Sequence, residues 1–390
     1  MGTKSLAMIR TGWLPTRQAN GIQVIRMCEA FAALGIEVTL YYVPSSVLRD
    51  EITDFYNIKR PLTLKPLPRA LLPMRKSFTL KTWTSFPSFV HALIWSGFVT
   101  HMLCRGKADV YFVRDPMIAW WLVRRGLPTV LEMHELPSGL ERTFVRRVSR
   151  ERDLKLIISV TEHLRVDLVN RLGIPLEKTV TLHDGVDLET FGSSITKDEA
   201  RQLLGLPLDR PLVVYTGQLY AQKGIDTLVN ALPMLGSAQA IVVGGTQEDV
   251  RRVQKVAGEV GALNVRLVGY VLPPKVPLYL KAADVLVLPF LADLDHWAYH
   301  ASPLKLFEYM ASRRPIVASR LPGLEEVLTD GENALLYPSG DPVALASAIN
   351  RLLSDEALCA RLGVQAYQDV HRYSWKGRAT TILQLIEIHV

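Results

Sequence analysis

Short apolar runs alternate along this chain with longer stretches whose apolar positions recur every three to four residues. Runs this rich in Val, Ile and Leu predict strands that are covered on both faces. Strands that alternate with helices are typical of βαβ units and a parallel sheet. In the first part of the chain, a helix is predicted around residues 21–34, and the predicted strands are LAMI (6–9), EVTLYYV (37–43), DVYFV (109–113), TVLEM (129–133) and KLIISV (155–160).

The same pattern begins again at residue 211, after a predicted helix and linker at 191–210. The fold class expected is therefore α/β, with two facing, doubly wound, Rossmann-like domains. Such domains bind ligands beyond the carboxyl ends of their strands, so we expect a ligand in the cleft between them. The second series of predicted strands is PLVVYTG (211–217), AIVVGG (240–245), VRLVGY (265–270), DVLVLPF (284–290) and PIVAS (315–319).

Length and composition agree with two folded domains. A chain of 390 residues is too long for one ordinary core, and 48% hydrophobic with 21% charged residues is typical of a folded protein. Cys28, Cys104 and Cys359 are scattered, which indicates a reducing compartment and no structural metal. The run between Lys4 and Arg10 is too short for the apolar part of a signal peptide. We therefore expect a cytoplasmic protein.

The charge is uneven. Residues 1–190 hold 26 Lys and Arg against 18 Asp and Glu, a net of +8, whereas residues 191–390 hold 19 against 20, a net of −1. A basic half suits nucleic acid, anionic lipid or a phosphate-bearing substrate, and an ordinary solvated surface also explains it. No aromatic platform is interleaved with the basic residues, so nucleic acid is not an expected partner.

The segment Thr82–Cys104 has no Lys, Arg, Asp or Glu but contains Pro87, His91 and His101. These residues favour a buried or surface-lying helix over a membrane span. Because basic residues flank the segment, peripheral contact with the inner face of an anionic membrane is a further expectation.

The stretch ASPLKLFEYM (301–310) predicts a helix with Ser302 as N-cap and Pro303 in the first helical position. The free amides of Leu304 and Lys305 would then form an anion cradle, to which the Lys305 ammonium adds a full charge. Glu308 lies on about the same face and suits hydroxyls such as those of a ribose. The alternative is an exposed pair of Lys305 with Glu308, worth about 0.2–0.5 kcal/mol.

The loop TGQLYAQKGIDTL (216–228) follows a predicted buried strand and opens a helix. Gly217 allows a close turn of the backbone, and Lys223 offers a second charge for phosphate oxygens. The loop is not a Walker A sequence, and the chain has no GxGxxG, so a nicotinamide cofactor is not expected.

Together these motifs resemble the retaining glycosyltransferases of family 4, which have the two-domain GT-B fold. The Gly-Arg-Leu…Lys-Gly loop of that family is similar to Gly217-Gln218-Leu219…Lys223-Gly224. Its "Glu-(Ala/Tyr)-Met-Ala" helix and "Pro-(Ile/Val)-Val-Ala" strand resemble residues 308–311 and 315–318. HDGVDLETF (183–191) resembles the loop that closes the N-terminal domain, and RYSW…L (372–386) resembles the terminal helix.

The resemblance implies an acceptor-binding domain at 1–190, a nucleotide-sugar-binding domain at 191–371, and a helix at 372–390 that crosses back to the first. It also implies donor-binding and catalytic roles. Glu308 would bind the ribose, and Lys223 and the amides of Leu304 and Lys305 would bind the diphosphate. The donor-binding set is Gly21, Gly217, Gln218, Lys223, Gly269, Tyr270, Val271, His300, Ser302, Pro303, Leu304, Lys305 and Glu308, and the catalytic set is His134, Lys223 and Glu308.

Two positions depart from the family pattern. Gln218 stands where the loop arginine is expected, and His300 stands where the first glutamate of Glu-x7-Glu normally touches the donor sugar. Our hypothesis is that Lys305 replaces the lost arginine charge.

On the N-terminal side, Arg17, Asn20 and Gly21 follow the first strand, and the resemblance implies that they line the acceptor site and approach the donor diphosphate. An ordinary βα loop is the alternative. His134 follows a strand directly, and its implied role is a hydrogen bond to the donor sugar or leaving phosphate. Arg114 also ends a strand and would support the acceptor or pair with Asp115.

The predicted activity is therefore transfer of a sugar from a UDP- or GDP-sugar to a hydroxyl of a glycan or lipid-linked acceptor. No cofactor and no metal are expected, although DLDH (293–296) contains an Asp-x-Asp. The alternatives are a nucleotide-sugar-binding protein with lost or weak catalysis and a GT-B epimerase.

Overall fold

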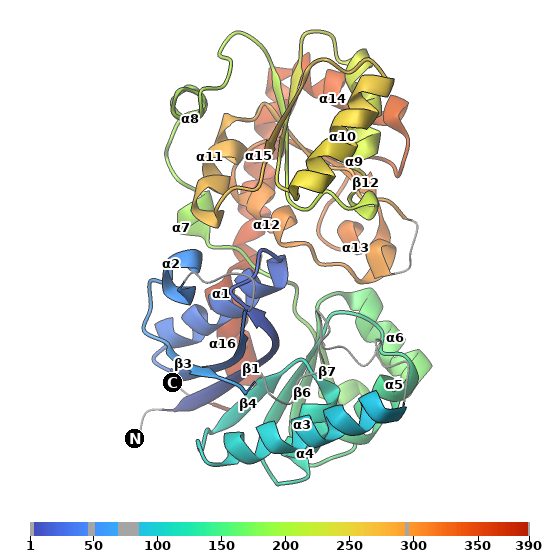
Figure 1. Cartoon of the computed structure of the whole chain (residues 1–390). Coiled ribbons are helices and arrows are strands. Elements are labelled where there is room, and N and C mark those ends of the chain that lie inside the picture. The colour runs from blue at the N-terminus through green and yellow to red at the C-terminus, as the bar shows by residue number, and fades with distance from the viewer. Residues whose placement is uncertain (1–3, 46–50, 69–85, 293–295, 389–390) are drawn as a thin grey trace. The chain divides into compact units, whose positions relative to one another are not determined.

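The computed structural model describes residues 4–45, 51–68, 86–292 and 296–388. The chain divides into two compact units (Figure 1). Unit 1 consists of residues 1–183 and 375–390, and unit 2 consists of residues 184–374. The sequence placed the boundaries after residues 190 and 371, and the structure divides the chain at 183/184 and 374/375.

Unit 1 contains a seven-stranded parallel sheet in the order β3-β2-β1-β4-β5-β6-β7. The strand order reverses between β1 and β4, which is the topological switch point of this sheet. The strands are β1 (Ser5–Leu14), β2 (Glu37–Pro44), β3 (Thr63–Pro66), β4 (Val110–Val113), β5 (Thr129–Met133), β6 (Leu154–Ser159) and β7 (Thr179–Thr181).

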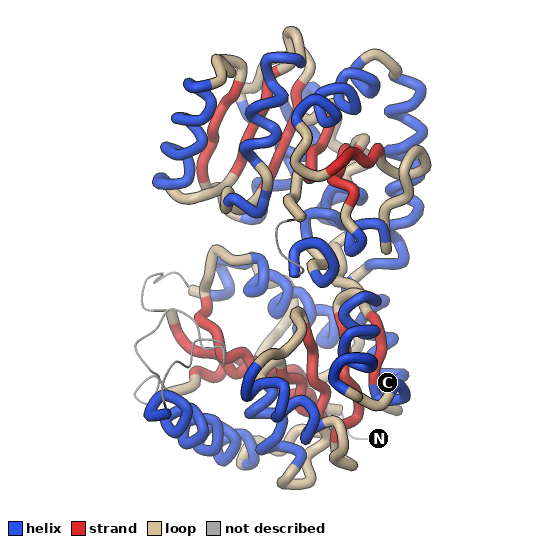
Figure 2. The backbone as a smooth tube through the Cα atoms, turned by 90° about the vertical axis from the view of Figure 1, so that its right-hand side faces the viewer, coloured by secondary structure: helices blue, strands red, loops and turns tan. Residues whose placement is uncertain are grey.

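Helices cover both faces of the sheet in unit 1 (Figures 1 and 2). Alternate strand residues such as Ile9 and Leu131 form a core with the helices that follow β3, β4, β5 and β6. On the other face, α1 packs against α16, although the two are far apart in sequence. The helices are α1 (Ala19–Ala33), α2 (Ile52–Tyr56), α3 (Phe86–Cys104), α4 (Pro116–Val123), α5 (Gly139–Val148), α6 (Glu162–Leu172), the 3-10 turn η2 (Leu176–Lys178) and α16 (Trp375–Leu385).

Unit 2 repeats the plan with a six-stranded parallel sheet in the order β10-β9-β8-β11-β12-β13. Its switch point lies between β8 and β11. The strands are β8 (Leu212–Thr216), β9 (Gln239–Val243), β10 (Val265–Gly269), β11 (Val285–Leu288), β12 (Ile316–Arg320) and β13 (Leu335–Pro338).

The strands of unit 2 are apolar on both faces because each face has its own core. Val213 and Tyr215 pack with one set of helices, whereas Leu212 and Val214 pack with another. The helical segments are α7 (Leu188–Phe191), α8 (Lys197–Leu204), η3 (Ala221–Lys223), α9 (Ile225–Ala231), η4 (Leu232–Met234), α10 (Gln247–Glu259), η5 (Pro273–Lys275), α11 (Val276–Ala282), the π-helical η6 (His296–His300), α12 (Leu304–Ala311), α13 (Pro322–Glu325), α14 (Pro342–Leu353), α15 (Glu356–Asp369) and η7 (Val370–Tyr373).

The expected α/β architecture is confirmed, and three strands were missed. The missed strands β3, β7 and β13 each lie at the edge of a sheet. The uncharged segment predicted as a helix forms α3 from residue 86, and residues 82–85 lie outside the described part. None of the helices in the described ranges has the length and apolarity needed to cross a membrane.

A buried ion pair ties the terminal helix α16 to the sheet of unit 1. Arg378 is 5% exposed, and its Nη2 donates to Oε2 of Glu132 at 2.8 Å. Its Nε donates to the carbonyl of His183 at 2.9 Å. Glu132 also accepts a hydrogen bond from Gln23 Nε2 of α1 at 3.0 Å. The pair thus joins β5, α1 and α16 in one place.

We predict that Arg378→Met destabilises unit 1 by about 3–5 kcal/mol, because it removes one partner of a buried pair. The urea dependence of the unit 1 unfolding transition measures this change. Lys376→Met on the exposed side of α16 is the matched control, with an expected change within about 0.5 kcal/mol. Equal effects of the two substitutions would contradict the anchoring role.

Candidate functional site

The loop after β8 comes unusually close to two other segments. Gly217 has φ of +131°, and a Cβ there would lie 2.5 Å from Nζ of Lys305. Gly224 has φ of +67°, and a Cβ there would lie 1.5 Å from the carbonyl oxygen of Pro289. Both positions therefore require glycine, for backbone conformation and for space. The sequence predicted that Gly217 allows a close turn of the backbone. In the structure, the atoms that come close to both glycines belong to this chain itself.

Side chains from β8 and α10 fix this loop. Tyr215 Oη donates to the carbonyl of Gln218 at 2.5 Å. Arg252 Nη2 donates to the carbonyl of Leu219 at 2.8 Å, and Arg252 Nη1 pairs with Asp226 at 2.7 Å. Arg252 was not identified from the sequence, because it lies in an amphipathic helix with no motif around it. The loop is therefore held in a defined shape.

The predicted cap of α12 is wrong by one residue. The helix begins at Leu304, its N-cap is Pro303 in an extended conformation, and no side chain caps it. The hydroxyl of Ser302 instead accepts a hydrogen bond from the amide of Asp184 at 3.2 Å. Ser302 therefore holds the chain segment near residue 184 to the start of α12, and the first amides of the helix, at Leu304 and Lys305, have no side-chain cap.

Tyr309 positions α12 against the end of β8. Its hydroxyl accepts a hydrogen bond from the amide of Thr216 at 2.8 Å. Lys305 lies one turn earlier on the same helix, so this bond brings Lys305 beside Gly217. The helix and the loop are thus one structural unit at the switch point of the sheet.

Lys223 and Lys305 meet over the ring of Phe290. Their Nζ atoms lie 4.6 and 5.3 Å from the ring centroid, and Lys305 Nζ also lies 3.9 Å from the centroid of Tyr215. The Lys305 Nζ is buried and has no hydrogen-bond partner, which rules out the exposed pair with Glu308.

Burial lowers the pKa of the Lys223 ammonium to about 7. Burial, and then the nearby charge of Lys223, lower the pKa of Lys305 well below its ordinary value, whereas the carboxylate of Glu308 acts in the opposite sense. Two neighbouring ammonium groups repel each other, and the buried Nζ of Lys305 has also lost its hydration, so an anion would be stabilising beside them. The arrangement therefore suits a ligand with a dense negative charge.

Apart from Gly21, which belongs to unit 1, the remaining predicted donor residues lie in the same unit. Glu308 is half-buried, one turn after Lys305. Gly269 ends β10 with φ of +78°, and its carbonyl accepts from the amide of Gly244 at 2.7 Å. Tyr270 and Val271 follow it and are half-buried. His300 is 4% exposed at the end of η6, and Asp293–Asp295, just before η6, lie outside the described residues.

In unit 1, Glu132 contacts two of the predicted residues, His134 and Arg114. His134 Nε2 is 2.7 Å from Oε1 of Glu132, and Arg114 Nη2 is 2.6 Å from the same oxygen. The predicted pairing of Arg114 with Asp115 is wrong, because Asp115 instead caps α4. The charges of Arg114 and Arg378 hold the pKa of Glu132 well below its usual range despite burial. Glu132 itself was not identified from the sequence, because it reads as part of an apolar strand.

Gly21, Asn20 and Arg17 stand at the start of α1. A Cβ on Gly21 would lie 2.4 Å from Tyr56 Oη, so packing within unit 1 already explains this glycine. Asn20 Oδ1 accepts from Arg10 Nη2 at 2.9 Å, and Arg17 is exposed.

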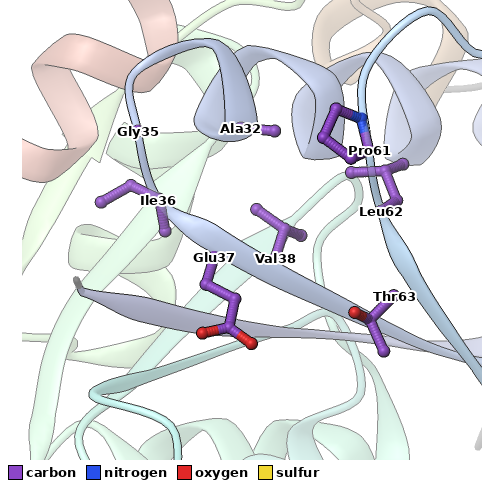
Figure 3. A pocket seen from close by; sticks show the side chains of 8 residues that line it. All are labelled: Ala32, Gly35, Ile36, Glu37, Val38, Pro61, Leu62 and Thr63. Atoms are coloured by element: carbon purple, nitrogen blue, oxygen red, sulfur yellow. The ribbon is translucent and has the colours of Figure 1, made fainter.

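A pocket of about 410 Å³ lies elsewhere in unit 1, at the amino ends of β2 and β3 and away from the carboxyl edge of the sheet (Figure 3). Glu37 is its one charged lining residue, and a negative charge does not suit an anionic ligand. Among the described residues, no group of three His, Cys, Asp or Glu side chains has the arrangement of a metal site.

We predict that binding of inorganic pyrophosphate takes up protons at about pH 8, because the anion favours protonation of Lys223, whose pKa is lowered by burial to about 7. Since Lys223 of the free protein loses its charge as pH rises through about 7, affinity should fall above that pH. Calorimetry in buffers of different ionisation enthalpy measures the uptake. Lys223→Ala should take up about one proton fewer, whereas Lys255→Ala, on an exposed residue, should behave as wild type. Identical uptake in Lys223→Ala and wild type would refute the assignment.

Two family models match the chain. The model described as Glycosyltransferase Family 4 matches residues 21–190, and the model described as Glycosyl transferases group 1 matches residues 210–355. A D-inositol 3-phosphate glycosyltransferase of Xylanimonas cellulosilytica is 31% identical over 59% of this chain, and the match spans 56% of that relative. The enzyme of the same name from Corynebacterium urealyticum is 24% identical over 97% of this chain and 94% of its own length. A phosphatidyl-myo-inositol mannosyltransferase of Mycobacterium leprae is 28% identical over 74% of this chain and 76% of its own length.

Solved structures share the fold over nearly the whole chain. Sucrose-phosphate synthase from Thermosynechococcus elongatus has a TM-score of 0.76 at 22% identity, covering 98% of both chains. HepE of Anabaena, solved in complex with UDP, has a TM-score of 0.75 at 17% identity, covering 99% of this chain and 100% of its own. Glycosyltransferase family models thus match both halves of the sequence, and the solved structures share the fold of both units. The chain is a glycosyltransferase of family 4 with the GT-B fold.

Proposed function

We propose that this glycosyltransferase moves a sugar from a nucleotide-diphosphate sugar to a hydroxyl group, with retention of the anomeric configuration. The observation that carries the proposal is the convergence of the Lys223 and Lys305 ammonium groups over the ring of Phe290, at the switch point of unit 2. A diphosphate would bring negative charge to these two basic groups. The UDP complex of the structurally similar HepE supports a nucleotide-sugar as the donor.

The proposed reaction forms a bond from the acceptor oxygen to the anomeric carbon and breaks the bond from that carbon to the donor phosphate. The acceptor hydroxyl gives its proton to the departing phosphate on the same face. Negative charge grows on that phosphate, and Lys223, Lys305 and the first amides of α12 would stabilise it. Lys305 would supply the charge of the arginine that Gln218 replaces. Glu308, on the same helix, would accept hydrogen bonds from the ribose.

His134 would contact the donor sugar or the leaving phosphate. The ionised Glu132 can only accept a hydrogen bond, so Nε2 of His134 donates to it. The tautomer that carries its proton on Nε2 has Nδ1 as an acceptor, which suits a sugar hydroxyl. No cofactor or metal is part of the proposal, because the lysines and the helix start supply the positive charge.

The acceptor is proposed to be a hydroxyl of a glycan or lipid-linked molecule. The names of the inositol 3-phosphate and phosphatidylinositol enzymes among the relatives support a hydroxyl-bearing acceptor, and the second supports one attached to lipid. The exposed Ile94 and Phe98 lie one turn apart on α3, and Arg105 and Lys107 follow that helix. These residues support contact with the cytoplasmic face of an anionic membrane.

Release of nucleotide from a panel of UDP-, GDP- and ADP-sugars, with and without hydroxyl acceptors, tests the activity. We predict that Lys223→Ala and Lys305→Ala each lower turnover by roughly 10²–10³, the effect of removing one preorganised donor. Lys255→Ala is the control. If Lys305→Ala retained full donor affinity while Lys223→Ala abolished it, Lys305 would not replace the missing arginine. Donor binding without turnover for any acceptor would favour a binding protein.

Sedimentation with vesicles tests the membrane contact. We predict more protein in the pellet with anionic than with neutral vesicles, and less after Ile94→Ser/Phe98→Ser. Arg124 is an exposed arginine that stacks on Trp120. The substitution Arg124→Gln is therefore a control for the loss of one positive charge from unit 1. Equal pelleting with neutral and anionic vesicles would exclude the proposed surface.

A further inference from the structure

Three residues of unit 1 form one row across adjacent strands. Ile9 of β1 pairs with Val113 of β4, and Val113 pairs with Leu131 of β5. The next residues along the chain are Arg10 in β1, Arg114 directly after the end of β4, and Glu132 in β5. Neighbouring positions in register project from the same face of a parallel sheet. Glu132 contacts Gln23 of α1 and Arg378 of α16, so the row faces these two helices.

The row holds more positive charge than its carboxylate balances. Glu132 already bonds Arg114, Arg378, His134 and Gln23. The partner that the structure gives to Arg10 is the neutral amide of Asn20, and Nε of Arg10 is buried with no hydrogen-bond partner. Burial, followed by the charge of Arg114, lowers the pKa of the Arg10 guanidinium to about 10. A buried cation beside a second cation calls for an anion.

The row also lies where doubly wound sheets commonly bind ligands, beside the switch point of the sheet. The switch point lies between β1 and β4 (Figure 1), and Arg10 belongs to β1 whereas Arg114 directly follows β4. Asn20, which binds Arg10, lies in the first turn of α1. That helix has 15 residues, no side-chain cap and no acidic residue in its first turn. Its free amides and dipole favour an anion at this end.

We propose that Arg10 and Arg114 bind a phosphate group carried by the acceptor. Two planar guanidinium groups match phosphate oxygens through paired, charge-assisted hydrogen bonds. The donor diphosphate has its own cations in unit 2, Lys223 and Lys305, so the cations of unit 1 are left for the other substrate. The assignment to the acceptor rests on the proposed function, whereas the phosphate site itself does not.

Calorimetric titration of the full chain with inorganic phosphate tests the site. The titration uses the Lys223→Ala/Lys305→Ala background, which removes the cations of unit 2. Arg10→Gln should weaken phosphate binding there by roughly tenfold or more, the loss expected for charge-assisted bonds. Arg10→Lys keeps the charge without the planar fork and should give an intermediate loss. Arg124→Gln should bind as the background does. Phosphate affinity within about twofold of the background in Arg10→Gln would overturn the proposal.

Thermal unfolding separates a phosphate site from a purely structural Arg10. Without phosphate, Arg10→Gln should unfold at the same temperature or a higher one, because it removes an uncompensated buried charge. A purely structural Arg10 would lower that temperature and leave the phosphate response unchanged.

A measurement of donor affinity distinguishes a site for the acceptor phosphate from a site for the donor diphosphate. With the wild-type lysines, Arg10→Gln should retain its affinity for the nucleotide-sugar, and an equal loss of donor and phosphate affinity would overturn the assignment to the acceptor. If no nucleotide-sugar binds the wild-type chain, the proposed function fails while the phosphate result still stands.

The source of the phosphate is resolved by two probes. If sn-glycerol 3-phosphate competes with inorganic phosphate, and this competition is lost in Arg10→Gln, the ligand is a soluble phosphate monoester. If the protein sediments with phosphatidate vesicles, and less of the Arg10→Gln variant does so, the phosphate belongs to a lipid head group. Either result supports the site, whereas Arg10→Gln behaving as wild type with both probes contradicts it.

Discussion

Positive charge held out of water at the carboxyl edge of a parallel sheet is the constraint that shapes both units. In unit 2, the Lys305 ammonium is buried against Tyr215 and Phe290 without a hydrogen-bond partner. In unit 1, the Arg10 guanidinium is buried beside Arg114. Neither arrangement favours folding, because a buried charge loses its hydration. The sheets and their apolar cores must offset this cost, and the basic side chains are then already in place for an anionic ligand.

Glu132 shows how the fold supports the site in unit 1. Its carboxylate is bonded by residues from α1, from the ends of β4 and β5, and from α16 at the far end of the chain. The same group that anchors α16 also orients His134 and neutralises part of the charge of Arg114. Structural and chemical roles are therefore coupled here, and a change at Glu132 would disturb both at once. The uncompensated cation is Arg10, in the same row.

The central strands could be predicted from sequence because each carries a dense apolar run that two layers of helices cover. The edge strands β3, β7 and β13 could not, because an edge strand pairs on one side only and needs no such run. Motif spacing also brought Lys223, Lys305 and Glu308 into one region. It did not show that Ser302 bonds the amide of Asp184, or that Arg114 pairs with Glu132 and not with Asp115. These partners are distant in sequence or sit in segments without a motif.

The sequence alone thus determined the two α/β units, the order of most strands and helices, and the loops in which charged residues gather, since periodicity and turn residues act over short distances. Tertiary structure alone decided which charges are buried and which are compensated. Arg10 and Arg378 are both arginines in or near apolar stretches, yet Arg378 pairs with Glu132 whereas the partner of Arg10 is a neutral amide. Strand register and the packing of α16 cause this difference, because they set the distance from each guanidinium to the same acidic group.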